Sequence, residues 1–139
     1  MCGIFGYTGQ KQAQGLILGG LKHLEYRGYD SSWVARQNGH QAILVEKTHG
    51  KIKNLEDLLK IHPLKGNTAI GHTRWATHGT PSRENAHPHL DGEDQIAVVH
   101  NGIIENYTHL KNELIKEGHR FKSQTDTEVI VHLIEKFYK

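Results

Sequence analysis

The stretch CGIFGYT, residues 2–8, opens the chain directly behind the initiator methionine and holds its only cysteine. Apolar and polar side chains alternate loosely along these residues, which predicts a β-strand. The cysteine at its start has two interpretations. Cys2 is either a buried strand residue, since cysteine is among the residues most often buried, or a thiol placed at the beginning of the chain for its chemistry.

Removal of the methionine would make Cys2 the first residue, and methionine before a small residue is normally excised. A free α-amine has a pKa of about 7.7–8.0, so much of it is neutral at cellular pH. One residue would then hold both a nucleophile and its base, which is the N-terminal form of nucleophile activation.

Composition and charge favour one globular domain. The chain has 139 residues, 36% of them hydrophobic and 23% charged, which is typical of a folded, soluble protein. The net charge is +2 and the basic residues are scattered, so we expect no nucleic-acid partner. A single cysteine excludes an internal disulfide. The apolar runs are too short to span a membrane and no signal peptide is recognisable, so we expect a cytoplasmic protein without membrane contact.

Hydrophobic periodicity predicts strands and helices mixed as in α+β or α/β layers. The expected strands are residues 2–8, 33–37, 41–48, 68–75 and 95–100, the second and third joined at Asn38-Gly39. The expected helices are residues 10–25, a short one capped by Asn54 and ending at Ile61, one from Tyr107 closed by Gly118, and one after a Thr125–Glu128 capping box. The last helix should present Ile130, Leu133, Ile134 and Phe137 on one face. The long polar segment 76–94 is typical of a functional loop.

Acyl chemistry needs donors for an oxyanion, and the segment HNG, residues 100–102, offers two. Asn101 has a side-chain amide, and Gly102 allows a backbone N–H to approach closely. Such a pair stabilises a tetrahedral oxyanion by several kcal/mol. The alternative interpretation is a plain Asn-Gly turn.

The segment HTRWATHG, residues 72–79, gathers a cation, an indole, two hydroxyls and two imidazoles at a strand end. Arg74 could bind a substrate carboxylate through two hydrogen bonds, or it could be a solvated arginine beside a packed tryptophan. Asp126 falls in the first turn of the last expected helix, where a carboxylate is favourable in any case. The other interpretation of Asp126 is a partner for a ligand ammonium group.

The twelve histidines suggest no metal site. His87 and His89, in HPH, resemble a metal-binding pair, but the chain has no HExxH motif and no second cysteine to complete a zinc set. Neither GxGxxG nor a Walker motif occurs in the glycine-rich stretches. We therefore expect neither a metal nor an organic cofactor.

Six segments resemble one known family, in the same order along the chain. They are CGIFGY (2–7), LEYRGYDS (24–31), GHTRWATHG (71–79), NAHPH (85–89), VVHNGIIENY (98–107) and SQTDTEVIVHLI (123–134). The chain thus resembles the glutaminase domain of the glucosamine-6-phosphate synthase family, also called glutamine–fructose-6-phosphate aminotransferases (isomerizing). These are class II glutamine amidotransferases. The amidophosphoribosyltransferase type shares the N-terminal CGI but generally differs around the Arg-Trp segment, and it is the more distant alternative.

The resemblance implies the fold and the reaction. It implies an α+β N-terminal nucleophile hydrolase fold, a four-layer αββα sandwich with two antiparallel sheets between helices. It also implies that Cys2 attacks the side-chain amide of L-glutamine, releasing ammonia and leaving a γ-glutamyl thioester for water to hydrolyse. By the same resemblance, Asn101 and Gly102 form the oxyanion hole, and Arg27 orients the cysteine.

The resemblance also implies a glutamine pocket. Arg74 would hold the α-carboxylate and Asp126 the α-ammonium, while Thr77 and His78 help to line the pocket. Trp75 resembles the residue that gates the passage of ammonia. A site that pairs both charges of glutamine would reject amides that lack them, because its own charges would be left buried and unpaired.

Two departures from the family pattern bear on these expectations. After DS the family usually has Ala-Gly, whereas this chain has Ser32-Trp33, so Trp33 must find space for a large ring or point outward. The family's glutaminase domain also extends beyond Lys139. We expect residues 1–139 to be its N-terminal portion, with the remaining strands and the sugar isomerase domains that bind fructose 6-phosphate outside this chain. An inactive remnant, or a module that binds glutamine without turnover, is the alternative, and the full-length enzyme is expected to be a homodimer.

Overall fold

Two antiparallel sheets lie between layers of helices in the computed structural model, which describes residues 2–37, 39, 41–75, 82 and 84–138. The larger sheet has the order β1 (Gly3–Thr8), β4 (Thr68–Arg74), β2 (Ser31–Gln37), β3 (Leu44–His49), and the smaller one pairs β5 (His89–Leu90) with β6 (Ala97–Val98). The helices are α1 (Ala13–Leu24), α2 (Ile52–Ile61), α3 (Tyr107–Lys116) and α4 (Glu128–Tyr138), with a 3-10 turn η1 (Glu25–Arg27).

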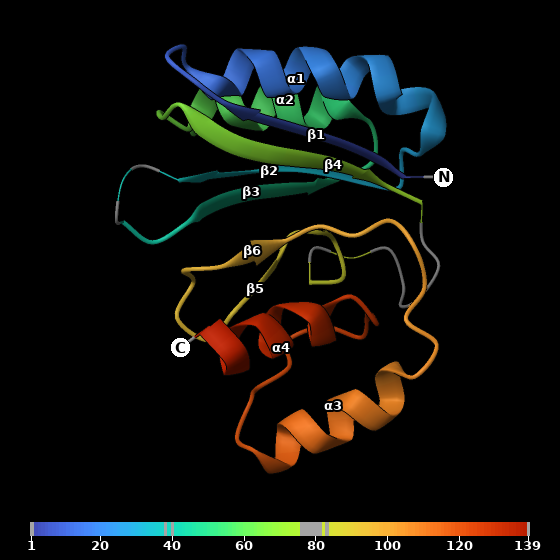
Figure 1. Cartoon of the computed structure of the whole chain (residues 1–139). Helices are drawn as coiled ribbons and strands as arrows, with labels where there is room; N and C mark the ends of the chain where they lie inside the picture. The colour runs from blue at the N-terminus through green and yellow to red at the C-terminus, as the bar shows by residue number, and fades with distance from the viewer. Residues whose placement is uncertain (1, 38, 40, 76–81, 83, 139) are drawn as a thin grey trace.

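The layers follow the predicted order. Helices α1 and α2 cover one face of the larger sheet, and the β5–β6 sheet lies against the other face (Figure 1). Helix α4 packs beyond β5–β6, and α3 lies outermost. The α+β class is therefore confirmed.

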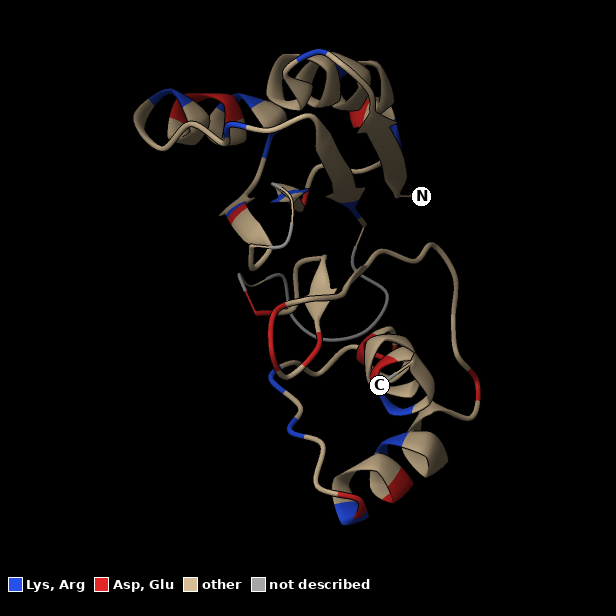
Figure 2. Ribbon diagram, turned by 60° about the vertical axis from the view of Figure 1, so that its left-hand side comes forward, with Lys and Arg blue, Asp and Glu red and all other residues tan. Residues whose placement is uncertain are grey.

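No helix in the described part of the chain is long and apolar enough to cross a membrane. Positive and negative residues are interspersed along α2 and α3 (Figure 2).

The main core lies between α1, α2 and the larger sheet. Ile17 and Leu21 of α1 and Leu55 of α2 are fully buried there. Helix and sheet approach closely because glycine stands at the contact points. A Cβ on Gly20 would lie 2.3 Å from the Phe5 ring.

The second core lies between the two sheets and contains the residue that departs from the family pattern. The Trp33 side chain is 0% exposed and packs with Ala35 and Ala86. Its ring stacks on the His72 imidazole, with centroids 5.5 Å apart and planes 15° apart. Trp33 therefore does not point outward, because the space between the sheets accommodates its ring.

Several element boundaries differ from the prediction. Strand β2 begins at Ser31, two residues early, and β6 holds only two of the six residues expected. Antiparallel pairing of β2 with β3 confirms the hairpin, although Asn38 of its turn lies outside the described residues. Asn54 does not cap α2, which begins at Ile52; its side-chain amide donates instead to the His49 carbonyl at 2.9 Å.

The prediction for α4 was wrong about both its cap and its buried face. The Glu128 carboxylate accepts hydrogen bonds from the backbone N–H groups of Lys122 and Ser123, both at 2.7 Å, so it does not close a box with Thr125. The buried residues of α4 are Glu128, Val129, Val131 and His132. Phe137 is 78% exposed, whereas the polar Glu128 and His132 find hydrogen-bond partners inside and take interior positions.

Candidate active site

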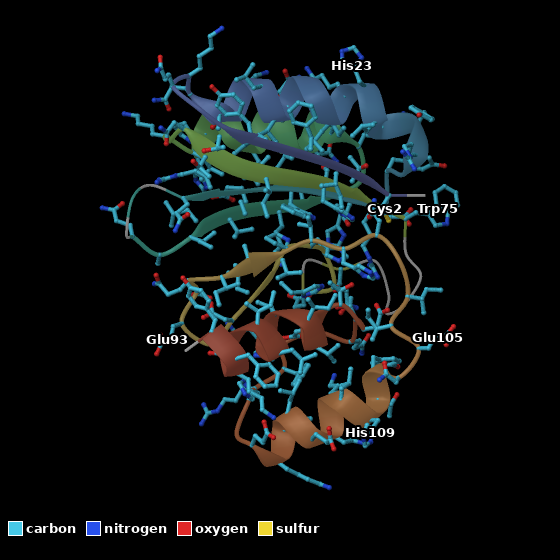
Figure 3. The ribbon with its side chains drawn as sticks, viewed as in Figure 1. Cys2, His23, Trp75, Glu93, Glu105 and His109 are labelled. Carbon is cyan, nitrogen blue, oxygen red and sulfur yellow. The ribbon has the colours of Figure 1, made fainter. Side chains whose placement is uncertain are left out.

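The pairing of β1 with β4 sets the position of the only thiol. Gly3 is opposite Thr73 in this register, and the Gly3 N–H donates to the Thr73 hydroxyl at 3.1 Å. Cys2 therefore lies beside the end of β4, where the Trp75 backbone N–H donates to its Sγ at 3.0 Å. Figure 3 shows Cys2 and Trp75 side by side at this edge of the sheet. The Cys2 thiol in turn donates to the Trp75 carbonyl oxygen at 3.4 Å, so the Trp75 backbone holds the cysteine side chain in place.

One cavity of about 530 Å³ collects the predicted site residues that the structure describes. These are Cys2, Arg27, Arg74, Trp75, Asn101, Gly102 and Asp126. Thr77 and His78 lie outside the described residues. The cavity is also lined by five residues that were not predicted as part of the site, namely His87, His100, Ile103, Thr125 and Thr127.

A hydrogen-bonded chain orients the Asn101 amide toward the cysteine. The His72 Nε2 lies 2.9 Å from Asn101 Oδ1, and Asn101 Nδ2 donates to the Cys2 carbonyl oxygen, also at 2.9 Å. His72 must donate its Nε2–H, because the amide oxygen only accepts. Burial lowers the pKa of His72 to about 4, so the ring is neutral at physiological pH. The side-chain amide of Asn101 is thus held with its NH2 facing Cys2.

The position of Gly102 has no room for a side chain. Its φ is +155°, and a Cβ at this position would lie 2.8 Å from the His100 Nε2. The Nδ1 of the same imidazole lies 3.3 Å from the Thr127 hydroxyl of the segment before α4. Asn101 and Gly102 are therefore fixed between β4 on one side and the α4 segment on the other.

The cavity holds one buried charge of each sign. Arg74 is 2% exposed and Asp126 is 3% exposed. Burial lowers the pKa of the Arg74 guanidinium, while the nearby acidic groups of Cys2, Asp30 and Asp126 oppose that shift. Asp126 Oδ2 accepts the Ile104 backbone N–H at 2.6 Å, which fixes the carboxylate at the start of the α4 segment. The cavity thus carries a buried cation on β4 and a buried anion just before α4, which complement the two charges of a zwitterion.

Arg27 reaches the cavity from η1, which packs against the end of β4. A Cβ on Gly28 would lie 3.0 Å from the Arg74 backbone, and the Asp30 N–H donates to the Arg74 carbonyl at 3.1 Å. The close contact at Gly28 therefore brings the turn and the strand end together.

The HPH histidines form part of a cluster of neutral rings in tilted and edge-on contact. The His87 ring lies 4.3 Å from that of His72 and 4.8 Å from that of His89, measured between centroids. Burial lowers the pKa of His87, and it lowers that of His89 to about 3. The Lys47 ammonium, which donates to the Pro88 carbonyl at 2.9 Å, adds a positive charge beside them. These rings pack between the sheets and support the cavity wall.

His72 is the positioning residue that was not predicted. The only signal available in the sequence was its spacing, because residues two apart in a strand face the same side of the sheet. His72 is two residues before Arg74, so both side chains lie on the face of β4 that is turned toward β5–β6.

Comparisons with known proteins agree on one family. Residues 44–138 match the family model described as "Glutamine amidotransferase domain". The whole chain is 55% identical to "Glutamine--fructose-6-phosphate aminotransferase [isomerizing]" of Clostridium perfringens and 58% identical to the enzyme of that name from Aquifex aeolicus. In both comparisons the chain spans 23% of the relative's length.

Solved structures share the fold. A glutamine phosphoribosylpyrophosphate amidotransferase from B. subtilis, complexed with ADP and GMP, matches with a TM-score of 0.81 and 31% identity over 98% of this chain and 29% of its own. A structure described as the allosteric regulatory enzyme of purine biosynthesis matches with a TM-score of 0.84 and 32% identity, over 98% of this chain and 30% of its own.

Proposed function

This chain belongs to the glutamine amidotransferase domain family, and we propose that its cavity hydrolyses L-glutamine with Cys2 as the nucleophile. The observation that supports the proposal most is the content of one cavity. It joins the only thiol of the chain, a candidate oxyanion donor at Asn101, and two buried charges, Arg74 and Asp126, that complement the two charges of an amino acid.

In the proposed reaction the Cys2 α-amine, freed by methionine removal, takes the thiol proton. The Sγ then bonds to the side-chain amide carbon of glutamine. The carbon–nitrogen bond breaks as the nitrogen accepts that proton and leaves as ammonia. Water adds to the resulting γ-glutamyl thioester, which releases glutamate and restores the thiol.

Asn101 and Gly102 supply the proposed oxyanion donors. The Asn101 NH2 already faces the Cys2 residue through its bond to the Cys2 carbonyl oxygen. Donors fixed in advance stabilise developing charge without reorganisation, and loss of one such donor lowers kcat by about 10²–10³. The His72 hydrogen bond that orients the amide supports this role.

Substrate selection follows from the two buried charges. Arg74 would bind the α-carboxylate and Asp126 the α-ammonium group of glutamine. An amide without these groups would leave both protein charges unpaired in a buried site, which is a severe penalty. Trp75, which is 49% exposed and packs edge-on against Tyr29, stands at the cavity wall where ammonia would leave.

For the whole protein we propose that ammonia passes to fructose 6-phosphate, giving glucosamine 6-phosphate. The names of its 55–58% identical relatives support this acceptor. The two solved structures match this chain at 31–32% identity. The amidophosphoribosyltransferase type is therefore the less supported alternative. The acceptor would bind in the part of such a protein that this chain does not span. The single cysteine, which forms no disulfide, favours a reducing, cytoplasmic setting.

Glutamate release by the purified chain tests the proposal. Intact mass first verifies that Cys2 is the first residue, and glutamate is then measured with and without the Cys2→Ala substitution. We expect release by the parent chain only. A matched chain with one residue added before Cys2 should fold equally well and lose turnover. Folded parent protein that releases no glutamate would contradict the proposal.

A further inference from the structure

The geometry points to a transition-metal site formed by His119, His132 and Glu135, which none of the preceding roles use. None of the three lines the Cys2 cavity. Their ligand atoms, one from each side chain, all lie within 4.8 Å of one another. In the described part of the chain this is the only group of three or more histidine, cysteine or acidic residues with that property.

The donor atoms converge on one point. Glu135 Oε2 lies 3.0 Å from His119 Nδ1 and 3.0 Å from His132 Nδ1. Ligand atoms of a tetrahedral zinc ion, each about 2.0–2.1 Å from the metal, are about 3.3 Å apart. Two of the three separations are thus close to the required value. The third, between the two imidazole nitrogens, is at most 4.8 Å and would shorten on metal binding.

The backbone holds the ligands in place independently of any metal. His132 and Glu135 are three residues apart on α4, so they share one face of the helix. His119 follows α3, and its backbone N–H donates to the Leu114 carbonyl at 3.0 Å. A metal ion would therefore join the end of α3 to the middle of α4.

The groups around the ligands are those that usually support a metal site. The Gly92 backbone N–H donates to Glu135 Oε1 at 3.2 Å, which turns Oε2 toward the imidazoles. The Glu128 carboxylate lies 3.7 Å from His132 Nε2, on the far side of that ring from the cluster, which is a charge contact and not a hydrogen bond. Ligating carboxylates commonly have an outer partner such as the Gly92 N–H, because it fixes the orientation of the ligand.

Ligand type and burial select the ion. Two imidazoles and one carboxylate suit Zn²⁺ and related transition metals, whereas Mg²⁺ and Ca²⁺ prefer oxygen ligands. The side chains of His119 and Glu135 are 16% and 15% exposed, and that of His132 is 2% exposed. One side of the cluster is thus open to solvent, which provides an entry path and a fourth position for water.

Metal titration of tag-free protein tests the site. Binding of Zn²⁺ is followed by calorimetry and binding of Co²⁺ by its visible absorption, near pH 7.5 where imidazoles are available as ligands. All proteins carry Cys2→Ser, so that the thiol cannot compete for metal. His119→Gln and Glu135→Gln are compared with His109→Gln, a matched control on α3 whose side chain is 72% exposed and points away from the protein (Figure 3).

We expect one Zn²⁺ per chain and a tetrahedral Co²⁺ spectrum, both retained in His109→Gln. Loss of an outer partner alone typically weakens a metal site by about 10–100-fold, so each ligand substitution should weaken binding by at least tenfold. Absence of stoichiometric binding, or equal affinity in the His119→Gln, Glu135→Gln and His109→Gln proteins, would overturn the inference. Circular dichroism confirms that each variant is folded before titration.

Discussion

Replacement of His72 tests whether a neutral imidazole orients the proposed oxyanion donor, Asn101. His72 is fully buried, and its Nε2 lies 2.9 Å from Asn101 Oδ1. His72→Leu removes the donor but keeps a side chain of similar size. His72→Gln is the matched control, because its side-chain NH2 reaches about as far as Nε2 and restores the hydrogen bond.

The size of the effect follows from this contact. A buried acceptor left without its donor costs about 1–3 kcal/mol, and Asn101 can lower that cost by rotating its amide away from Cys2. Complete loss of an oxyanion donor costs about 10²–10³ in kcat, and rotation removes part of that contribution. We therefore expect kcat to fall about tenfold to a hundredfold in His72→Leu, since a tenfold change corresponds to about 1.4 kcal/mol.

Steady-state glutamate release over a range of glutamine concentrations gives kcat and KM separately, and urea unfolding reports stability. The effect should fall on kcat, because the proposed partners of the substrate charges, Arg74 and Asp126, are unchanged. His72→Gln should recover most of the rate. A folded His72→Leu protein with unchanged kcat would refute the reasoning, and so would an equal loss in both variants.

Three further predictions concern charge, packing and pH. Asp126→Asn keeps an acceptor for the Ile104 N–H but loses the charge. The KM for glutamine should therefore rise at least tenfold while kcat changes little. An unchanged KM would mean that Asp126 does not bind the ammonium group. Trp33→Ala should lower the free energy of unfolding by about 3–5 kcal/mol in urea, and a loss below about 1 kcal/mol would mean that the ring is not a packing element. The pKa of His72 is lowered to about 4 from 6.5, so the unfolded chain takes up a proton first and stability falls as pH drops from 6.5 toward 4. Between pH 7 and pH 5 this costs about 2 kcal/mol. Urea unfolding at these two pH values should therefore show a smaller loss in His72→Leu, and an identical loss would contradict a neutral His72.

Several residues of the candidate site could be selected from the sequence because their signals are local. A cysteine directly after the initiator methionine, an Asn-Gly pair at a strand end and an arginine in HTRW are each visible in a few letters. The structure brings Cys2, Asn101 and Arg74 to one cavity. Sequence periodicity alone could not bring them together, because the pairing of β1 with β4 joins residues about seventy positions apart.

The remaining features depended on partners distant in the sequence. The α4 face was predicted wrongly because Glu128 and His132 look like surface residues until Ser123 and Glu135 are seen beside them. Trp33 seemed too large for its position, and only the opposite His72 ring shows where it fits. His72 itself looked like one histidine among twelve, since its role depends on Asn101 in another segment.

The covalent intermediate gives the most direct test of Cys2 as the nucleophile. Protein with a free Cys2 amine is mixed with glutamine, quenched in acid within the first turnovers and mapped by peptide mass spectrometry. A γ-glutamyl group on the N-terminal peptide, absent from Cys2→Ala, is the predicted result. Glutamate released at the same rate by both proteins, with no adduct on that peptide, would contradict it.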